Sequence, residues 1–239
     1  MWHGRNISKV NLAATFVVVA IHALCSAGCR GNKSADQGTQ NHAATIVTKP
    51  PLNIIGVDVS GSTAKWRAQQ VSFLRVAYAQ AGKYSENVIV YAVDSKTACI
   101  QGQLTCRHNE QPGKSVIDAV LKPPSKRSEG TKPLLFWQEA LAECERANHA
   151  STIRIQFVGD GDNDSPSDAA QIAETAANLA RRQNVTVGMF GLDKDNYKTV
   201  STQFADFGST RSVFTIDTDK ATMLKGLSDQ RLLEGGQAK

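Results

Sequence analysis

Short apolar runs alternate with longer mixed segments along most of this chain. Nearly continuous apolar runs occur at 52–59, 87–93, 153–158 and 185–190. Runs of this length predict strands that are buried on both faces of a sheet. A further short strand is expected at 212–216. The stretches between these strands are long enough to hold helices.

Apolar residues recur at helical spacing in those intervening segments. The first segment, 66–84, places Val71, Leu74 and Tyr78 on one face. Further helices are expected at 116–121, 134–147, 165–180, 197–207 and 221–233, the last with Met223, Leu224, Leu227 and Leu232 on its buried side.

Strands and helices therefore alternate from residue 52 to residue 234, which we take as one domain. This alternation is typical of an α/β fold: a doubly wound, mostly parallel, Rossmann-like sheet with helices on both faces. One stretch departs from the pattern, because it is rich in loop-forming residues and contains Cys99 and Cys106. We expect an edge hairpin there. In an oxidising compartment the two thiols would form a disulfide, and two free thiols are the alternative.

The first thirty residues have a different character. A basic stretch with Arg5 and Lys9 precedes an apolar run from Leu12 to Leu24. This run is shorter than the roughly 20 residues that span a bilayer, and small residues follow it, so residues 1–28 are expected to be a secretory signal peptide. An uncleaved membrane anchor is the alternative interpretation.

Ser26-Ala27-Gly28-Cys29 resembles the bacterial lipoprotein box, in which the cysteine is acylated and becomes the new N-terminus. The resemblance implies lipidation of Cys29 and attachment to a bacterial membrane, on its periplasmic or cell-surface side; an ordinary cysteine behind a cleaved signal is the alternative. Residues 29–51 have little apolar periodicity and are expected to form a flexible tether, and 235–239 a short tail.

Composition excludes several classes of protein. The chain has 239 residues, of which 41% are hydrophobic and 21% charged, so it is neither a disordered chain nor a coiled coil. Its net charge of +5 falls to +3 without the first 28 residues, which is too mild to indicate a nucleic-acid partner. The five cysteines are too few for a disulfide-built scaffold.

Hydroxyl and carboxylate side chains follow two of the predicted strands. Asp58, Ser60 and Ser62 come at the end of the first strand, and Asp160 follows the strand near 155. Thr131 lies just before a predicted helix. Ligands bind to open parallel sheets at the carboxyl ends of strands where the strand order reverses, so these five residues are expected to converge. They supply only oxygen atoms, which suit a hard cation such as Mg²⁺.

These residues resemble the metal-ion-dependent adhesion site of the von Willebrand factor A (vWA) family. The family pattern is Asp-x-Ser-x-Ser after the first strand, a threonine that opens a later helix and an aspartate after the fourth strand. The resemblance covers residues 52–230 and departs at Gly159, where the family more often has threonine or serine. It implies that Ser60, Ser62 and Thr131 bind the metal directly and that Asp58 and Asp160 act largely through water. The metal would be Mg²⁺, or another divalent cation such as Mn²⁺ or Ca²⁺.

A metal held mostly by neutral hydroxyls keeps much of its charge and favours an anionic oxygen at its open position. We therefore expect a binding module, not an enzyme, which captures an Asp or Glu carboxylate of a partner protein. We also expect the site to bind without large motion, although the resemblance allows the helix at 221–233 to shift when a partner arrives.

Three other interpretations compete with this one. A metal-dependent hydrolase of the haloacid-dehalogenase type also places an aspartate after its first strand, but it needs a second aspartate where this chain has Ser60. A nucleotide-binding domain is disfavoured because the first turn lacks GxGxxG and GxxxxGK[ST]. The third is that Asp58, Ser60 and Asp160 only shape turns.

Overall fold

The computed structural model describes residues 49–122, 130–216 and 218–235. The chain divides into two compact units, residues 1–45 and 46–239, and all described residues belong to the second. The expected signal peptide, Cys29 and most of the expected tether lie outside the described residues. Within the described ranges, no helix combines the length and the apolar character needed to cross a membrane.

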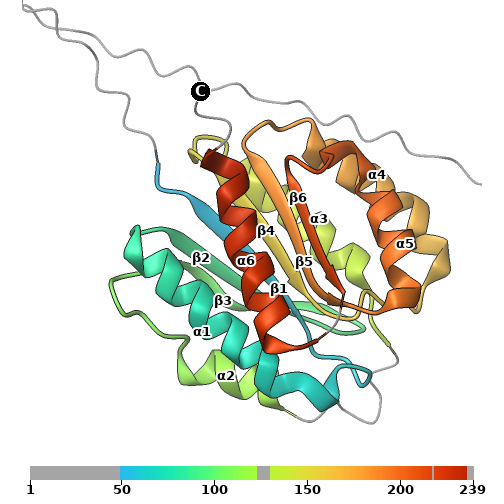
Figure 1. The fold of residues 1–239 in the computed structure, drawn as a ribbon, viewed down its shortest axis with the longest axis horizontal. Coiled ribbons are helices and arrows are strands. Elements are labelled where there is room, and N and C mark those ends of the chain that lie inside the picture. Colours follow the sequence, from blue (N-terminus) through green and yellow to red (C-terminus); the bar gives the residue numbers. More distant parts are fainter. Residues whose placement is uncertain (1–48, 123–129, 217, 236–239) are drawn as a thin grey trace, which may run out of the picture. The chain divides into compact units, whose positions relative to one another are not determined.

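Six strands of the described chain form a single sheet in the order β3-β2-β1-β4-β5-β6. All neighbouring strands are parallel except β2 and β3, which are antiparallel. The sheet is therefore doubly wound and mostly parallel, as the alternation of strands and helices predicts (Figure 1). Its strands are β1 (Leu52–Asp58), β2 (Asn87–Val93), β3 (Thr97–Thr105), β4 (Ile153–Val158), β5 (Val185–Leu192) and β6 (Ser212–Ile216).

Helices of the described chain cover both faces of the sheet. One apolar core lies between the sheet and α1 (Arg67–Lys83), α2 (Lys114–Leu121) and α6 (Lys220–Gly235). The other lies between the sheet and α3 (Pro133–Arg146), α4 (Ala169–Ala180) and α5 (Lys194–Gln203). Figure 1 shows α1 and α6 in front of the sheet and α3 behind it. Short 3₁₀ turns complete the order: η1 (Ala64–Trp66), η2 (Pro166–Asp168) and η3 (Ala205–Phe207).

The strand order reverses between β1 and β4. The chain runs outward from β1 to β2 and β3, and then returns to the other side of β1 for β4, β5 and β6. In the register of this central pair Val57 lies beside Val158, so the two strands end at the same level. The residues that follow β1 and β4 are therefore neighbours, which is the arrangement on which the expected site depends.

Two helices differ from their expected form. The helix predicted at 197–207 begins at Lys194 and ends at Gln203, because the Asp193 side chain accepts a hydrogen bond from Asp195 N (3.1 Å) and caps it early. In α6, Met223 and Leu227 are buried as expected, but Leu232 is 73% exposed. The helical period instead turns Gln230 into the core, where it is fully buried.

The expected bridge between Cys99 and Cys106 is not formed, and both are free thiols. Cys99 lies on the exposed edge strand β3, whereas Cys106 lies just beyond that strand and is buried. An extended strand advances about 3.3 Å per residue, so the two Cα atoms are roughly 20 Å apart. A disulfide requires a separation below about 7 Å. The disulfide prediction is wrong because the segment is an extended strand and not a closed loop.

Candidate metal centre

The loop that leaves β1 folds back over the Asp58 side chain. Asp58 and Ser60 are buried, and Asp58 Oδ1 accepts a hydrogen bond from Ser60 N at 2.8 Å. The hydroxyls of Ser60 and Ser62 lie 3.0 Å apart. Ser62 is exposed. The turn therefore gathers a carboxylate and two hydroxyls at the end of the central strand and leaves one hydroxyl open to solvent.

Three polar side chains hold this loop in place, one just before η1 and two on α1. The Asp58 carbonyl accepts hydrogen bonds from Thr63 Oγ1 (2.8 Å), Arg67 Nη1 (2.6 Å) and Gln70 Nε2 (2.7 Å). Arg67 Nη2 also donates to the Ser60 carbonyl at 2.7 Å. All three side chains are buried. Sequence reasoning missed them, although Arg67 and Gln70 interrupt the apolar face of the helix predicted at 66–84, which is a detectable signal.

Thr131 approaches Asp58 from the segment before α3. Its side chain is buried, and Thr131 Oγ1 lies 3.5 Å from both Asp58 Oδ1 and Asp58 Oδ2. The backbone of Thr131 is fixed by Asp164, whose side chain accepts a hydrogen bond from Thr131 N and whose own N donates to the Thr131 carbonyl at 3.2 Å. Asp164 is thus a positioning residue for Thr131, a role that the sequence did not suggest.

Asp160 occupies the loop after β4. Asp160 Oδ1 accepts a hydrogen bond from Asp162 N at 3.0 Å, and the Asp160 carbonyl accepts one from Asp193 N at 2.9 Å. The preceding Gly159 has no room for a side chain: a Cβ there would lie 2.5 Å from the Phe157 ring and 2.8 Å from Asp58 Cβ. The departure from the vWA pattern at this position therefore accompanies an aromatic ring packed under the loop.

The electrostatics of the site favour a cation. Burial raises the pKa of Asp58 to about 7, with a further contribution from the nearby negative charge of Asp160, against the hydrogen bonds from Ser60 and the charge of Arg67. Two carboxylates are thus held close together, and one of them is buried. A divalent cation between these loops would relieve both the burial of charge and the repulsion.

The set of donors fits a hard cation. In residues 49–122, 130–216 and 218–235 there is no cluster of three or more His, Cys, Asp or Glu side chains suited to a metal. A centre here must therefore rely on hydroxyl oxygens and water in addition to two carboxylates, which is compatible with Mg²⁺. Asp58 contacts both Ser60 and Thr131, Ser60 contacts Ser62, and Asp160 is near enough to Asp58 to affect its charge.

A cavity of about 370 Å³ opens beside these residues. Ser62 and Asp160 line both the cavity and the candidate metal centre. Trp66 and Leu192, which are almost completely buried, contribute apolar wall. The other lining residues are Lys65, Gly191, Asp193, Lys194 and Thr218.

No family model matches the sequence. No curated protein matches it either. Evidence on relatives therefore comes from comparison of the fold with solved structures.

Several solved structures share the fold at low sequence identity. A von Willebrand factor type A structure from Catenulispora acidiphila is 17% identical with a TM-score of 0.56, over 77% of this chain and 42% of that one. BatB from Bacteroides thetaiotaomicron is 13% identical with a TM-score of 0.51, over 77% of this chain and 98% of that one. Proximal thread matrix protein 1 from the mussel byssus, with a zinc-occupied metal-ion-dependent adhesion site (MIDAS) motif, is 12% identical with a TM-score of 0.52. The match covers 78% of this chain and 46% of that one.

Adhesive surface proteins are also among the similar folds. The pilus adhesin SpaC from Lactobacillus rhamnosus GG is 14% identical with a TM-score of 0.53, over 77% of this chain and 30% of that one. This chain therefore spans less than half the length of most of these proteins. The strand order and the helices on both faces agree with the expectation from sequence, and the described domain has the fold of a von Willebrand factor A domain.

Proposed function

We propose that this domain binds a protein ligand through a divalent cation held between the loops after β1 and β4. The observation that carries the proposal is the convergence of side-chain oxygen atoms from two separate segments, the loop after β1 and the segment before α3. Thr131 Oγ1 lies within 3.5 Å of both Asp58 carboxylate oxygens, and Ser60 and Ser62 lie on the same loop with hydroxyls 3.0 Å apart. Residues 58 and 131 are far apart in the sequence and meet only in the folded domain. The alternative that these residues only shape local turns therefore does not account for their contact.

In this proposal the neutral and the charged side chains bind the cation in different ways. Ser60, Ser62 and Thr131 hold the cation through neutral hydroxyls, and Asp58 and Asp160 hold it largely through water. The cation is Mg²⁺ or another divalent ion such as Mn²⁺ or Ca²⁺. It supplies positive charge that attracts an Asp or Glu carboxylate of the partner. The zinc-occupied MIDAS motif of the mussel-byssus protein supports a divalent cation at this place in the fold.

The role is adhesion and not catalysis. Similar folds that belong to a pilus adhesin and a minor pilin support a protein ligand. The metal-dependent hydrolase alternative needs a second carboxylate two residues after Asp58. That position is Ser60, whose backbone N–H donates to Asp58 Oδ1 and thereby occupies one of its oxygens.

Isothermal titration with Mg²⁺ and Mn²⁺ tests the metal centre directly. We expect the wild-type domain to bind one ion and the Asp58→Ala variant to lose at least about tenfold in affinity, since removal of a buried carboxylate leaves mainly neutral donors. Asp168→Ala is the matched control, because Asp168 lies on η2 and is not part of the candidate centre. Equal binding by Asp58→Ala and wild type would overturn the proposed centre.

Capture of a partner is tested separately. The wild-type and Asp58→Ala domains are immobilised and exposed to surface proteins with Mg²⁺ or with EDTA. The proposal predicts capture by the wild type in Mg²⁺ alone, without phosphatase or nucleotidase turnover. Metal-dependent turnover that Asp58→Ala abolishes would instead establish the hydrolase.

We also propose that Cys29 is acylated and tethers the domain to a bacterial membrane through residues 30–51. Acyl chains contribute about 0.8 kcal/mol for each buried CH₂, so two or more chains give stable anchoring. The Cys29→Ser variant is expected to leave the membrane fraction and to change mobility on a gel. A variant that remains membrane-bound with unchanged mobility would disprove lipidation.

A further inference from the structure

The cavity beside the candidate metal centre is lined by apolar, hydroxyl and charged residues. Trp66 is 2% exposed and Leu192 is 1% exposed, so both form fixed walls. Gly191 lies against the Trp66 ring with a positive φ of 87°, and a Cβ there would come within 2.9 Å of the indole. Glycine at this position thus keeps the ring and the cavity wall in place without strain.

Two of the lining residues are exposed lysines. Lys65 on η1 and Lys194 at the start of α5 both line the cavity. Within the described part of the chain, neither lysine forms an ion pair. Asp193, the acidic neighbour of Lys194, accepts a hydrogen bond from Asp195 N and serves as the cap of α5.

The charges of the cavity lining indicate what it would accept. Lys65 and Lys194 balance Asp160 and Asp193, so a divalent cation in the adjacent centre would make this region positive. Ser62 and Asp160 belong to both places, so a ligand that reaches the metal is already at the mouth of the cavity. The side chain next to the metal-bound carboxylate would therefore face the two lysines.

We propose that this cavity is a second subsite, which selects protein ligands with another acidic side chain close to the one that reaches the metal. Lys65 and Lys194 receive the second carboxylate. The inference rests on the proposed function. It narrows the expected ligand from any protein with an accessible carboxylate to a peptide segment with two nearby acidic side chains.

Synthetic peptides distinguish the two proposals. One peptide carries a single glutamate in a glycine–serine background, and three others carry two glutamates separated by zero, one or two glycines. In Mg²⁺ and low salt, at least one two-glutamate peptide should bind about tenfold more tightly than the single-glutamate peptide, because two lysine–carboxylate pairs are added. This advantage should shrink in 0.5 M NaCl, since exposed charges are screened.

Two variants test the lysines. Lys65→Gln/Lys194→Gln should remove the advantage of the two-glutamate peptides and change the single-glutamate affinity and Mn²⁺ binding much less. Lys198→Gln is the matched control, because Lys198 is an exposed lysine one turn along α5 that does not line the cavity. Metal-dependent binding that is equal for one and two glutamates, or an advantage that survives in the double variant, would overturn the subsite and leave the proposed function intact. Failure of every peptide to bind in Mg²⁺ would overturn both.

Discussion

At the scale of single residues, two glycines allow aromatic rings to pack directly beneath the candidate site. A Cβ on Gly56 would lie 2.7 Å from the Phe136 ring of α3, and one on Gly159 would lie 2.5 Å from the Phe157 ring. The two rings contact each other, with centroids 5.7 Å apart. The position of Asp58 therefore depends on a closely packed aromatic layer as well as on its own hydrogen bonds.

The Gly56→Ala substitution tests this packing. We expect it to lower the free energy of unfolding by about 1–3 kcal/mol, because an added methyl in a filled core displaces its neighbours. Urea denaturation measures the change. Gly102→Ala on β3 is the matched control, because a Cβ at this position would meet nothing within 4 Å, and it should change stability by less than about 0.5 kcal/mol. Equal effects from both substitutions would contradict the packing argument.

The sequence predicts the residues at the strand ends better than those that support them. Asp58, Ser60 and Asp160 follow recognisable buried strands, and parallel strands must end at the same edge of the sheet. Arg67 and Gln70 stabilise the same loop, but their partners are backbone carbonyls, which have no distinct sequence pattern. The interruption of the apolar face marks the two residues, but their partners are identified only when α1 is placed against β1.

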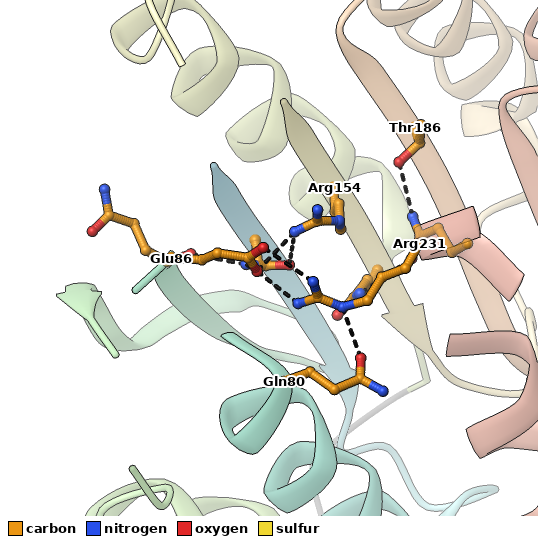
Figure 2. A network of polar contacts seen from close by, with 9 residues as sticks. Gln80, Glu86, Arg154, Thr186 and Arg231 are labelled. Carbon is orange, nitrogen blue, oxygen red and sulfur yellow. Dashed lines mark hydrogen bonds and ion pairs between the residues drawn. The ribbon is translucent and has the colours of Figure 1, made fainter. Parts of the chain in front are cut away.

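At the scale of elements, buried polar side chains join α6 to the sheet. Gln230 Nε2 donates to the Ile155 carbonyl at 3.3 Å, and its side chain also bonds that of Gln156 at 3.1 Å. The next residue, Arg231, donates to Glu86 Oε1 at 3.0 Å and to Glu86 Oε2 at 2.6 Å. Figure 2 shows Glu86 between Arg231 of α6 and Arg154 of β4, which donates to the same carboxylate at 2.8 Å.

Glu86 should make stability depend on pH. Burial raises its pKa, but the hydrogen bond from Arg231 and the charges of Arg154 and Arg231 outweigh burial and hold the pKa below its ordinary value of 4.5. As pH falls, the unfolded chain takes up a proton before the folded chain does. The stabilisation by Glu86 is therefore complete above the ordinary pKa and is lost as pH falls through the lower folded value.

The Glu86→Gln substitution provides the measurement. At pH 7 it should lower the free energy of unfolding by about 3 kcal/mol, because two arginines lose their buried partner. The difference from wild type should shrink steadily in urea denaturations below pH 4.5. Glu174→Gln, at an exposed position of α4, should have little effect at any pH. A Glu86→Gln deficit that stays constant down to pH 3 would refute the charge argument.

Strands and helices with a regular apolar pattern are predicted well from the sequence. Those with polar side chains at structurally important positions are predicted less well. Strands β1, β2, β4 and β5 are fully or almost fully buried, so their apolar runs identify them. Strand β3 is half-exposed and contains Gly102 and several polar residues, which look like a loop. The buried side of α6 differs from the prediction at Leu232 because Gln230 occupies a core position that hydrophobicity alone assigns to solvent.

At the scale of the whole molecule, the candidate metal centre lies at the carboxyl ends of the parallel strands, and the Glu86 contacts lie at their amino ends. Asp58 is the last residue of β1 and Asp160 lies just after β4, whereas Asn87 and Arg154 lie near the starts of β2 and β4. Helix α6 reaches from one end of the strands to the other. Its Met223 lies near Gly191, which lines the cavity, and its Arg231 binds Glu86. A displacement of α6 on ligand binding would have to break this distant ion pair.

We therefore predict that the domain binds its metal and partner without moving α6. Breaking a partly buried, bidentate ion pair and the Gln230 contacts together has a large cost. A ligand can shift an equilibrium only by its difference in affinity for the two states. Hydrogen exchange with and without Mg²⁺ and the tightest-binding peptide measures this. Added protection should be confined to 58–62, 130–132 and 159–164, while 221–233 stays unchanged. In Glu86→Gln, exchange in 221–233 should rise even without ligand. Ligand-dependent exchange across 221–233 in the wild type would show that the helix moves despite its contacts.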